Sequence, residues 1–226
     1  MNVHTIALYT CAAAVVMPGA EVITAQTGRR RVAPPELVRT LWGRPVPWAA
    51  AALVGVMAVM AVVQTVVPGV MPHLERTPDG PWWRALTALL VQTSGPGQLA
   101  FNLVAAAVVA PAAQRLFGPV RMPLLFVASG AAAHAVSMAG WSVHGGGDSV
   151  GLCGLVGALA CAYALTGERA PLRWLSLPVP AAGVVLCVLQ NNHGIGVLTG
   201  SLLGAAITLA SKRSRFRSRF RSRFRS

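Results

Sequence analysis

Long apolar segments recur along this chain and constrain its fold more than any other feature of the sequence. Six of them, separated by short polar breaks, reach or approach the roughly 20 residues that an α-helix needs to cross a bilayer. They are residues 47–67, 99–113, 123–141, 150–166, 174–189 and 194–210. Several are at the lower limit of length, so we expect their ends to extend into the flanking loops or the bilayer to thin around them. The pattern predicts an all-α membrane protein built as one six-helix transmembrane bundle.

The composition agrees with this prediction. Of the 226 residues, 54% are hydrophobic and 11% are charged, and six Asp and Glu are too few to solvate the surface of a soluble domain of this size. The four cysteines all fall within apolar segments and form no CxxC pair. We therefore expect neither a disulfide framework nor a metal site, and no other cofactor.

The basic residues outside the membrane indicate the orientation of the bundle. Arginines precede the first span and occupy the loops after the second and fourth spans, whereas the opposite loops hold only Arg76 and Arg84. By the positive-inside rule, both termini of the six-helix core, residues 47–211, are cytoplasmic, in the cell membrane. Residues 1–46 are expected to be a cytoplasmic or partly membrane-associated segment. Within them, the short apolar stretch 6–17 leaves three alternatives open: an additional span that starts outside, an interfacial segment, or an overlong start of the reading frame.

The last fifteen residues, 212–226, repeat the motif R-F-R-S and hold eight of the 19 Lys and Arg of the chain. Such a low-complexity segment is expected to be disordered in water and, next to a membrane helix, to bind anionic lipid headgroups. The residues assigned to this contact are Arg215, Phe216, Arg217, Arg219, Phe220 and Arg221. Arginines interleaved with aromatics also suit RNA, and a repeat without function is a further alternative, but attachment to a span favours lipid over a nucleic-acid partner.

Polar side chains inside the predicted spans are candidates for function, because a polar group in lipid is costly unless it faces the bundle interior. Gln98 and Asn102 lie four residues apart and so share one face of a helix. Cys153 lies near the start of the fourth span and His193 immediately precedes the sixth. A thiol and an imidazole within hydrogen-bond reach would be a nucleophile and its base.

Small residues predict how the fourth and sixth spans pack. Stripes of glycine let two helix backbones approach closely, and each of these spans carries one. The glycines concerned are Gly154, Gly157, Gly196, Gly200 and Gly204. If the two spans pack through these stripes, Cys153 and His193 meet near the extracytoplasmic ends of both helices.

Four fragments, in this order, resemble the rhomboid family of intramembrane proteases, over most of residues 82–204. They are "GPWWRALTALLVQ" with the Trp83–Arg84 pair, "FNLVAAAVVAPAAQRLFGPVRMPLLFVASG", "GLCG" and "HGIGVLTGSLLG". The resemblance implies that the residue at position 153 attacks a peptide carbonyl of another membrane protein and that His193 accepts its proton. It also implies that Asn102, with the adjacent Gln98 and the amide of residue 153, stabilises the oxyanion.

The sequence departs from the family pattern at three positions. Cys153 stands where the family has serine, Gln98 where it commonly has histidine, and Gly157 where many members have an aromatic side chain that packs on the histidine. A thiol fits imperfectly in a pocket shaped for serine, whereas Gln98 can still donate a hydrogen bond. The alternative to a peptidase is therefore an inactive member that binds transmembrane segments of client proteins.

Two neighbours of the motif are given lesser roles. Ser149 lies one turn before Cys153 and is expected to be too near the aqueous loop to serve as the nucleophile. Asp148 is expected to be a loop residue or an N-terminal cap of the fourth span, since the family orients its histidine without an acidic partner.

Overall fold

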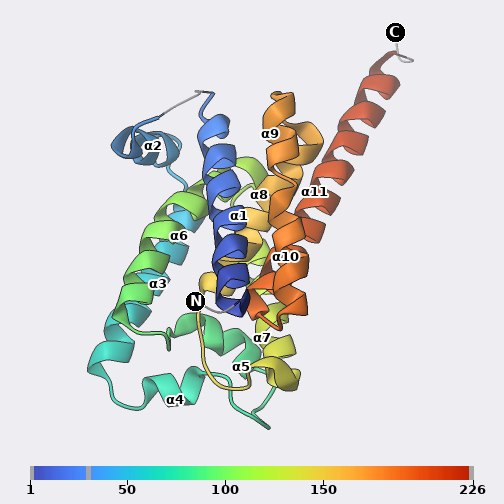
Figure 1. The fold of residues 1–226 in the computed structure, drawn as a ribbon. Coiled ribbons are helices and arrows are strands. Elements are labelled where there is room, and N and C mark those ends of the chain that lie inside the picture. Colours follow the sequence, from blue (N-terminus) through green and yellow to red (C-terminus); the bar gives the residue numbers. More distant parts are fainter. Residues whose placement is uncertain (1–2, 29–31, 224–226) are drawn as a thin grey trace.

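The computed structural model describes residues 3–28 and 32–223, with side chains described as far as residue 213, and shows a bundle of upright helices (Figure 1). Its long helices are α1 (Val3–Gln26), α3 (Trp48–Val66), α6 (Pro96–Phe117), α7 (Arg121–Val136), α8 (Ser149–Thr166), α10 (Pro178–Val188) and α11 (Asn192–Arg223). The shorter elements are α2 (Pro34–Leu41), α4 (Val70–Leu74), α5 (Arg84–Thr87), the 3₁₀ turn η1 (Ala88–Leu90), the π-helical turn η2 (Ser137–Trp141) and α9 (Ala170–Leu175). The described residues contain no strand, only an isolated bridge between Arg76 and Gly145.

The prediction of an all-α bundle of apolar helices is confirmed. The described residues contain seven helices long and apolar enough to cross a membrane: the six predicted spans and α1. Most of the spans that looked short in sequence are longer helices, because their ends extend into the flanking residues, as in Pro96–Phe117 and Asn192–Arg213. The fifth span is broken between α9 and α10, where Pro178 begins the second piece and supplies no backbone N–H to continue the first.

The N-terminal helix α1 favours one of the alternatives left open for the first residues, an additional span. It is 24 residues long and continues through Pro18 and Glu21, so its length and composition suit a span. It packs along α8 and α10, and at Gly19 a Cβ atom would lie 2.8 Å from Cγ1 of Val156. This contact ties α1 to the centre of the bundle.

Helix α8 is the central helix of the bundle. Its sequence, SVGLCGLVGALACAYALT, has no charged residue and is apolar or small on every side, which is typical of a span surrounded by other helices. It packs most extensively against α11 and also contacts α1, α6, α7 and α10. The residues that precede and begin α8 are therefore held in place by contacts with several other helices.

Glycines set the close approach of α8 and α11. A Cβ atom at Gly200 would meet the carbonyl oxygen of Gly154, and one at Gly196 would meet that of Val150. The remaining glycines of the predicted stripes lie in the same contact: Gly157 faces the carbonyl of Val197, and Gly204 faces Ala158. The two backbones touch, so the relative register of the helices is set by backbone shape.

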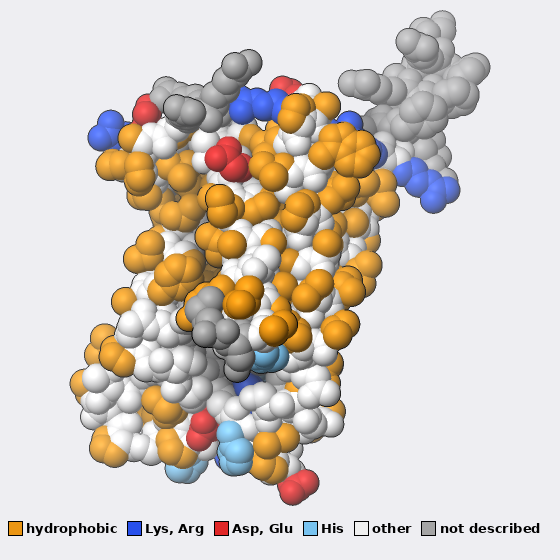
Figure 2. Space-filling model, in the orientation of Figure 1, with side chains coloured by type: hydrophobic (Ala, Val, Ile, Leu, Met, Phe, Trp, Pro, Cys, Tyr) orange, Lys and Arg blue, Asp and Glu red, His pale blue; other side chains and the backbone are white. Residues whose placement is uncertain are grey.

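The surface has the character of a membrane protein. Hydrophobic side chains cover most of the height of the bundle, and on the visible face most Lys and Arg gather at the end that carries α2 and α9 (Figure 2). Arg115 belongs to this basic end and donates hydrogen bonds to the carbonyls of Leu41 and Gly43. Arg29, Arg30 and Arg31, which contribute to the predicted orientation, lie outside the described residues.

The C-terminal repeat begins within helix α11, and its expected disorder in water stays a prediction. Helix α11 continues to Arg223, because adding residues to an existing helix avoids the cost of nucleation and arginine is a good helix former. The predicted lipid contacts lie outside the described side chains; they are Arg215, Phe216, Arg217, Arg219, Phe220 and Arg221.

Candidate active site

Helices α6, α8 and α11 all begin at the end of the bundle opposite α2 and α9 (Figure 1), and each carries a polar side chain near its start. Asn102 lies in the second turn of α6, Ser149 is the first residue of α8, and His193 is the second residue of α11. Each helix starts at this end, so its free backbone N–H groups and the positive end of its dipole point toward the site.

Ser149, and not Cys153, is the residue that the structure joins to His193. The Oγ atom of Ser149 lies 3.0 Å from Nε2 of His193, within hydrogen-bond distance. The sequence did not predict this contact, which forms because α8 begins at Ser149 and α11 begins beside it. A hydroxyl and an imidazole at this distance have the geometry that a nucleophile and its general base require.

The other ring nitrogen of His193 also has a partner. Its Nδ1 lies 2.8 Å from Oδ1 of Asn191, and the same oxygen accepts a hydrogen bond of 3.0 Å from the backbone N–H of His193. Asn191 therefore caps the first turn of α11 while contacting the imidazole. Nothing in the sequence pattern of the sixth span singled out Asn191, although its position before a helix start is typical of a capping residue.

The side-chain amides of Gln98 and Asn102 in α6 form a hydrogen-bonded chain that ends at the carboxylate of Asp148. Gln98 donates from Nε2 to Oδ1 of Asn102 at 2.9 Å, and Asn102 donates from Nδ2 to Oδ1 of Asp148 at 2.5 Å. Asn102 is only 1% exposed, so this chain is enclosed by the bundle. The amide expected to bind an oxyanion thus holds a carboxylate oxygen in this structure.

Asp148 has the position of an N-cap of α8 but not the contact. Its side chain makes no capping hydrogen bond, because its carboxylate turns to Asn102 instead. Burial raises the pKa of this carboxyl to about 6, although the hydrogen bond from the Asn102 amide favours its charged form. Asp148 therefore does not cap α8 through its side chain. It belongs instead to a polar cluster at this end of the bundle, which consists of Gln98, Asn102, Asp148, Ser149, Asn191 and His193.

Cys153 lies one helical turn farther into the bundle than Ser149. It packs against an apolar cluster that includes Cys11 and Val15 of α1 and Val179 of α10. Among the described residues, the hydrogen bonds of His193 go to Ser149 and Asn191, and the expected contact between Cys153 and His193 is not formed. In this arrangement the thiol is a packing residue.

A buried network that the sequence analysis missed holds the loop before α8. Arg76 is 5% exposed and donates from Nε to the carbonyl of Ser142 at 2.7 Å and from Nη1 to Nδ1 of His134 at 2.7 Å. His134 in turn contacts the carbonyl of Gly147 through Nε2 at 3.0 Å. Burial lowers the pKa of the Arg76 guanidinium. The signal available in the sequence was a histidine inside an apolar span, His134, which is costly unless it has a partner.

The Trp83–Arg84 pair of the first loop organises that loop and does not reach His193. Arg84 donates from Nη1 to the carbonyl of Glu75 at 3.0 Å and to Oγ1 of Thr77 at 3.1 Å. Its guanidinium also lies 5.5 Å from the centre of the Trp83 ring.

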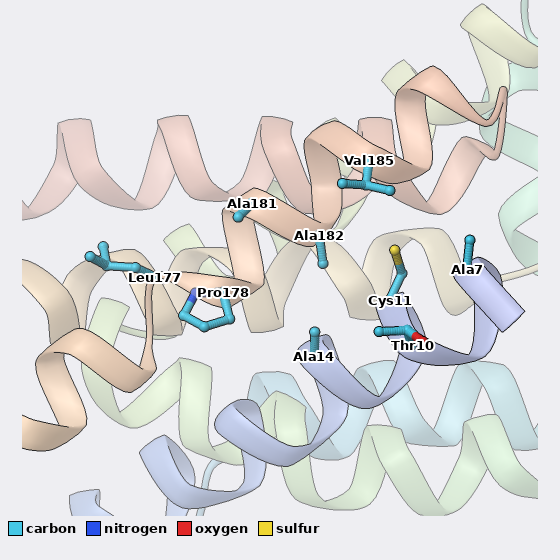
Figure 3. A pocket seen from close by; sticks show the side chains of 9 residues that line it. All are labelled: Ala7, Thr10, Cys11, Ala14, Leu177, Pro178, Ala181, Ala182 and Val185. Carbon is cyan, nitrogen blue, oxygen red and sulfur yellow. The ribbon is translucent and has the colours of Figure 1, made fainter.

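An apolar cavity of about 560 Å³ lies between α1 and α10 (Figure 3). Cys11 and Ala14 of α1 face Pro178 and Ala182 of α10 across it, and none of the polar residues around His193 lines it. Within the described part of the chain, no group of three or more His, Cys, Asp and Glu could hold a metal ion. The groups suited to acid–base chemistry, His193 and Asp148, therefore lie in the polar cluster and not in this cavity.

Comparison with known proteins identifies the family of this chain. The sequence matches the family model described as Rhomboid domain over residues 79–211, more than half of the chain. It is also similar to the rhomboid protease GluP of Bacillus subtilis (strain 168), with 29% identity over 135 residues. The alignment covers 57% of this chain and 26% of GluP, so the chain spans about a quarter of the length of that relative. The matched residues include the whole polar cluster around His193, and the chain is a member of the rhomboid family.

Proposed function

We propose that this protein is an intramembrane endopeptidase that hydrolyses peptide bonds in or near the transmembrane segments of other membrane proteins. The observation that supports the proposal most strongly is the 3.0 Å contact between Ser149 Oγ and His193 Nε2 at the end of seven membrane-suited helices. Membership of the rhomboid family and similarity to a rhomboid protease give the same reaction class.

In the proposed reaction, His193 removes the proton of the Ser149 hydroxyl while Oγ bonds to the carbonyl carbon of the substrate. The tetrahedral intermediate collapses, the peptide C–N bond breaks, and the leaving amine takes the proton from His193. A water molecule then attacks the acyl-enzyme while His193 takes its proton, and His193 returns this proton to Oγ of Ser149 as the ester bond breaks and the carboxylic acid product leaves. The negative oxygen of each intermediate is stabilised by the N-terminus of α8 and by the Asn102 amide once it releases Asp148.

Cys153 stays a predicted nucleophile on the resemblance alone. It occupies the serine position of the family motif, but four residues of helix separate it from Ser149 by about 6 Å along the axis. For Cys153 to act, His193 has to leave Ser149 and turn deeper into the bundle. We therefore assign the nucleophile to Ser149 and test both.

A second candidate function is the binding of transmembrane clients without cleavage. The observation that favours it is the Asp148 carboxylate on the Asn102 amide, which occupies the donor that an oxyanion needs. In this case the residues around His193 would have no catalytic activity, while the surrounding helices would still bind a transmembrane helix of the client in the bilayer.

The test uses the full chain in liposomes with a tagged single-span protein as substrate. We expect cleavage by the wild type, and a loss of at least about 10³-fold in kcat for Ser149→Ala and for His193→Ala, because each removes a member of one catalytic unit. Cys153→Ala is expected to retain activity. Loss in Cys153→Ala with retention in Ser149→Ala would assign the nucleophile to Cys153. Client binding without cleavage by the wild type would establish the second candidate.

A further inference from the structure

We infer that Asn191 is a positioning residue that fixes the tautomer and orientation of the His193 ring. Ser149, His193 and Asn191 then form a hydrogen-bonded row of three side chains, with His193 in the middle. The inference rests on the proposed function and adds to it a residue outside the nucleophile and base. It is carried by the contacts of a single oxygen atom, Oδ1 of Asn191.

The identity of that atom follows from the backbone. The N–H of His193 can only donate, and it lies 3.0 Å from the side chain of Asn191. The atom at this position must therefore be the acceptor oxygen, since the opposite orientation of the amide would place an NH₂ group against an N–H group.

The tautomer of His193 follows in turn. The same oxygen lies 2.8 Å from Nδ1, and an amide oxygen only accepts hydrogen bonds. In the neutral ring Nδ1 thus carries the proton, which leaves the lone pair on Nε2. That lone pair faces the Ser149 hydroxyl at 3.0 Å, as a general base requires.

The backbone around Asn191 is held independently of the ring. The Asn191 N–H donates to the carbonyl of Leu186 at 2.8 Å, and its own carbonyl accepts from the N–H of Gly194 at 3.0 Å. Gly194 lies against α10, where a Cβ atom would be 2.6 Å from the carbonyl of Gly183. The turn between α10 and α11 is therefore locked, and it presents Oδ1 at a fixed place.

Charged and titratable side chains of other elements surround the site: Arg76 of the first loop and His134 of α7 interact electrostatically with His193, Asp148 directly precedes Ser149, and Cys153 lies one turn deeper in α8. Asn191 contributes a neutral acceptor among them. Replacing it with a carboxylate keeps the acceptor and adds a charge that stabilises the protonated ring, so the two properties can be separated by substitution.

The experiment compares wild type, Asn191→Ala and Asn191→Asp, with Asn192→Ala as the matched control of a neighbouring asparagine. The first measurement is the ¹⁵N spectrum of histidine-labelled full-length protein in detergent micelles, with the His193 signals assigned by their absence in His193→Gln. We expect the proton on Nδ1 in the wild type and in Asn192→Ala, and a mixture of tautomers in Asn191→Ala.

The second measurement is the pH–rate profile for a single-span substrate, together with the rate at which a fluorophosphonate labels Ser149. Asn191→Ala is expected to lower kcat and the labelling rate by about 10²-fold with KM unchanged. Asn191→Asp is expected to recover most of this loss and to move the acid limb of the profile to higher pH.

Two results would overturn the inference. One is an Nε2-protonated His193 in the wild type or an unchanged tautomer in Asn191→Ala. The other is an active wild type in which Asn191→Ala matches Asn192→Ala in kcat, or Asn191→Asp is as impaired as Asn191→Ala. A wild type that neither cleaves nor labels counts against the proposed function alone, because the spectrum still tests the contact between Asn191 and His193.

Discussion

Two opposing effects act on the charge of Asp148, which lies next to Ser149 in sequence. The hydrogen bond from Asn102 stabilises the carboxylate, whereas burial to 5% exposure destabilises it, and the balance raises the pKa to about 6. Near neutral pH the site therefore carries a buried negative charge on the amide expected to bind an oxyanion. Protonation of Asp148 removes that charge without requiring the helices to move.

The first prediction concerns the pH dependence of stability. Because the folded pKa is about 6 and the unfolded value is about 3.9, the folded state binds more protons between these values. The contribution of Asp148 to stability is thus greatest below pH 4 and falls as pH rises through 6, by on the order of 3 kcal/mol in total. We expect Asp148→Asn to remove this decline.

Thermal unfolding in detergent between pH 4 and pH 8 provides the measurement, with the wild-type slope compared with that of the variant. Asp79→Asn serves as control, because Asp79 is exposed in the first loop. The same decline in Asp148→Asn as in the wild type would show that Asp148 is ionised as easily in the fold as in the unfolded chain.

At the scale of elements, the contact between α8 and α11 decides which side chains meet. Gly200 of α11 lies on the backbone of Gly154, and Gly196 lies on that of Val150, directly after Ser149. A shift of α11 by one turn deeper into the bundle would move His193 from Ser149 toward Cys153. The close backbone contact therefore selects the hydroxyl over the thiol.

The second prediction tests this contact by adding one methyl group. Gly200→Ala places Cβ against the Gly154 carbonyl and is expected to destabilise the protein by about 1–3 kcal/mol through overpacking. Gly55→Ala is the control: Gly55 is exposed in α3 with no atom within 4 Å of its Cβ position, so the change should be neutral or favourable by up to about 1 kcal/mol. Unfolding in detergent measures both, and equal stability of the two variants would contradict the assigned packing.

At the scale of the whole molecule, the seventh helix changes the expected orientation of the chain. If all seven helices cross the bilayer, the start of α1 and the end of α11 lie on opposite faces of it. By the positive-inside rule we expect the basic end of the bundle, with Arg39, Arg115 and Arg173, to be cytoplasmic and the His193 site to face the other side. The two ends of the six-helix core are then expected to share the cytoplasmic face.

The third prediction tests this orientation in cells. In a variant with all four cysteines replaced by alanine, we expect His4→Cys to react with a membrane-impermeant maleimide from outside and Arg39→Cys to react only after permeabilisation. Both side chains are exposed, so accessibility reports the side of the membrane. Reaction of both cysteines from the same side would show that α1 does not cross the bilayer.

Hydropathy and residue spacing determined much of this protein without its structure. Each span is a local property of about 20 residues, so the helices of the bundle, the glycine stripes and the positions of Asn102 and His193 could be read from short segments. The resemblance to the rhomboid family is carried by the same local motifs. It predicts a site at the end of the bundle where α6, α8 and α11 begin, because the polar residues of these spans lie near their starts.

Only the tertiary structure decided which groups at that end touch. The partner of His193 depends on the register of α8 against α11, which is set by contacts between backbones far apart in sequence. The attachment of Asp148 to Asn102 and of Arg76 to His134 likewise joins residues 46 and 58 positions apart, across loops whose paths no local pattern specifies. The sequence alone determined the helices and the family, whereas the choice of Ser149 over Cys153 at His193 required the packed bundle, since one helical turn separates the two candidates.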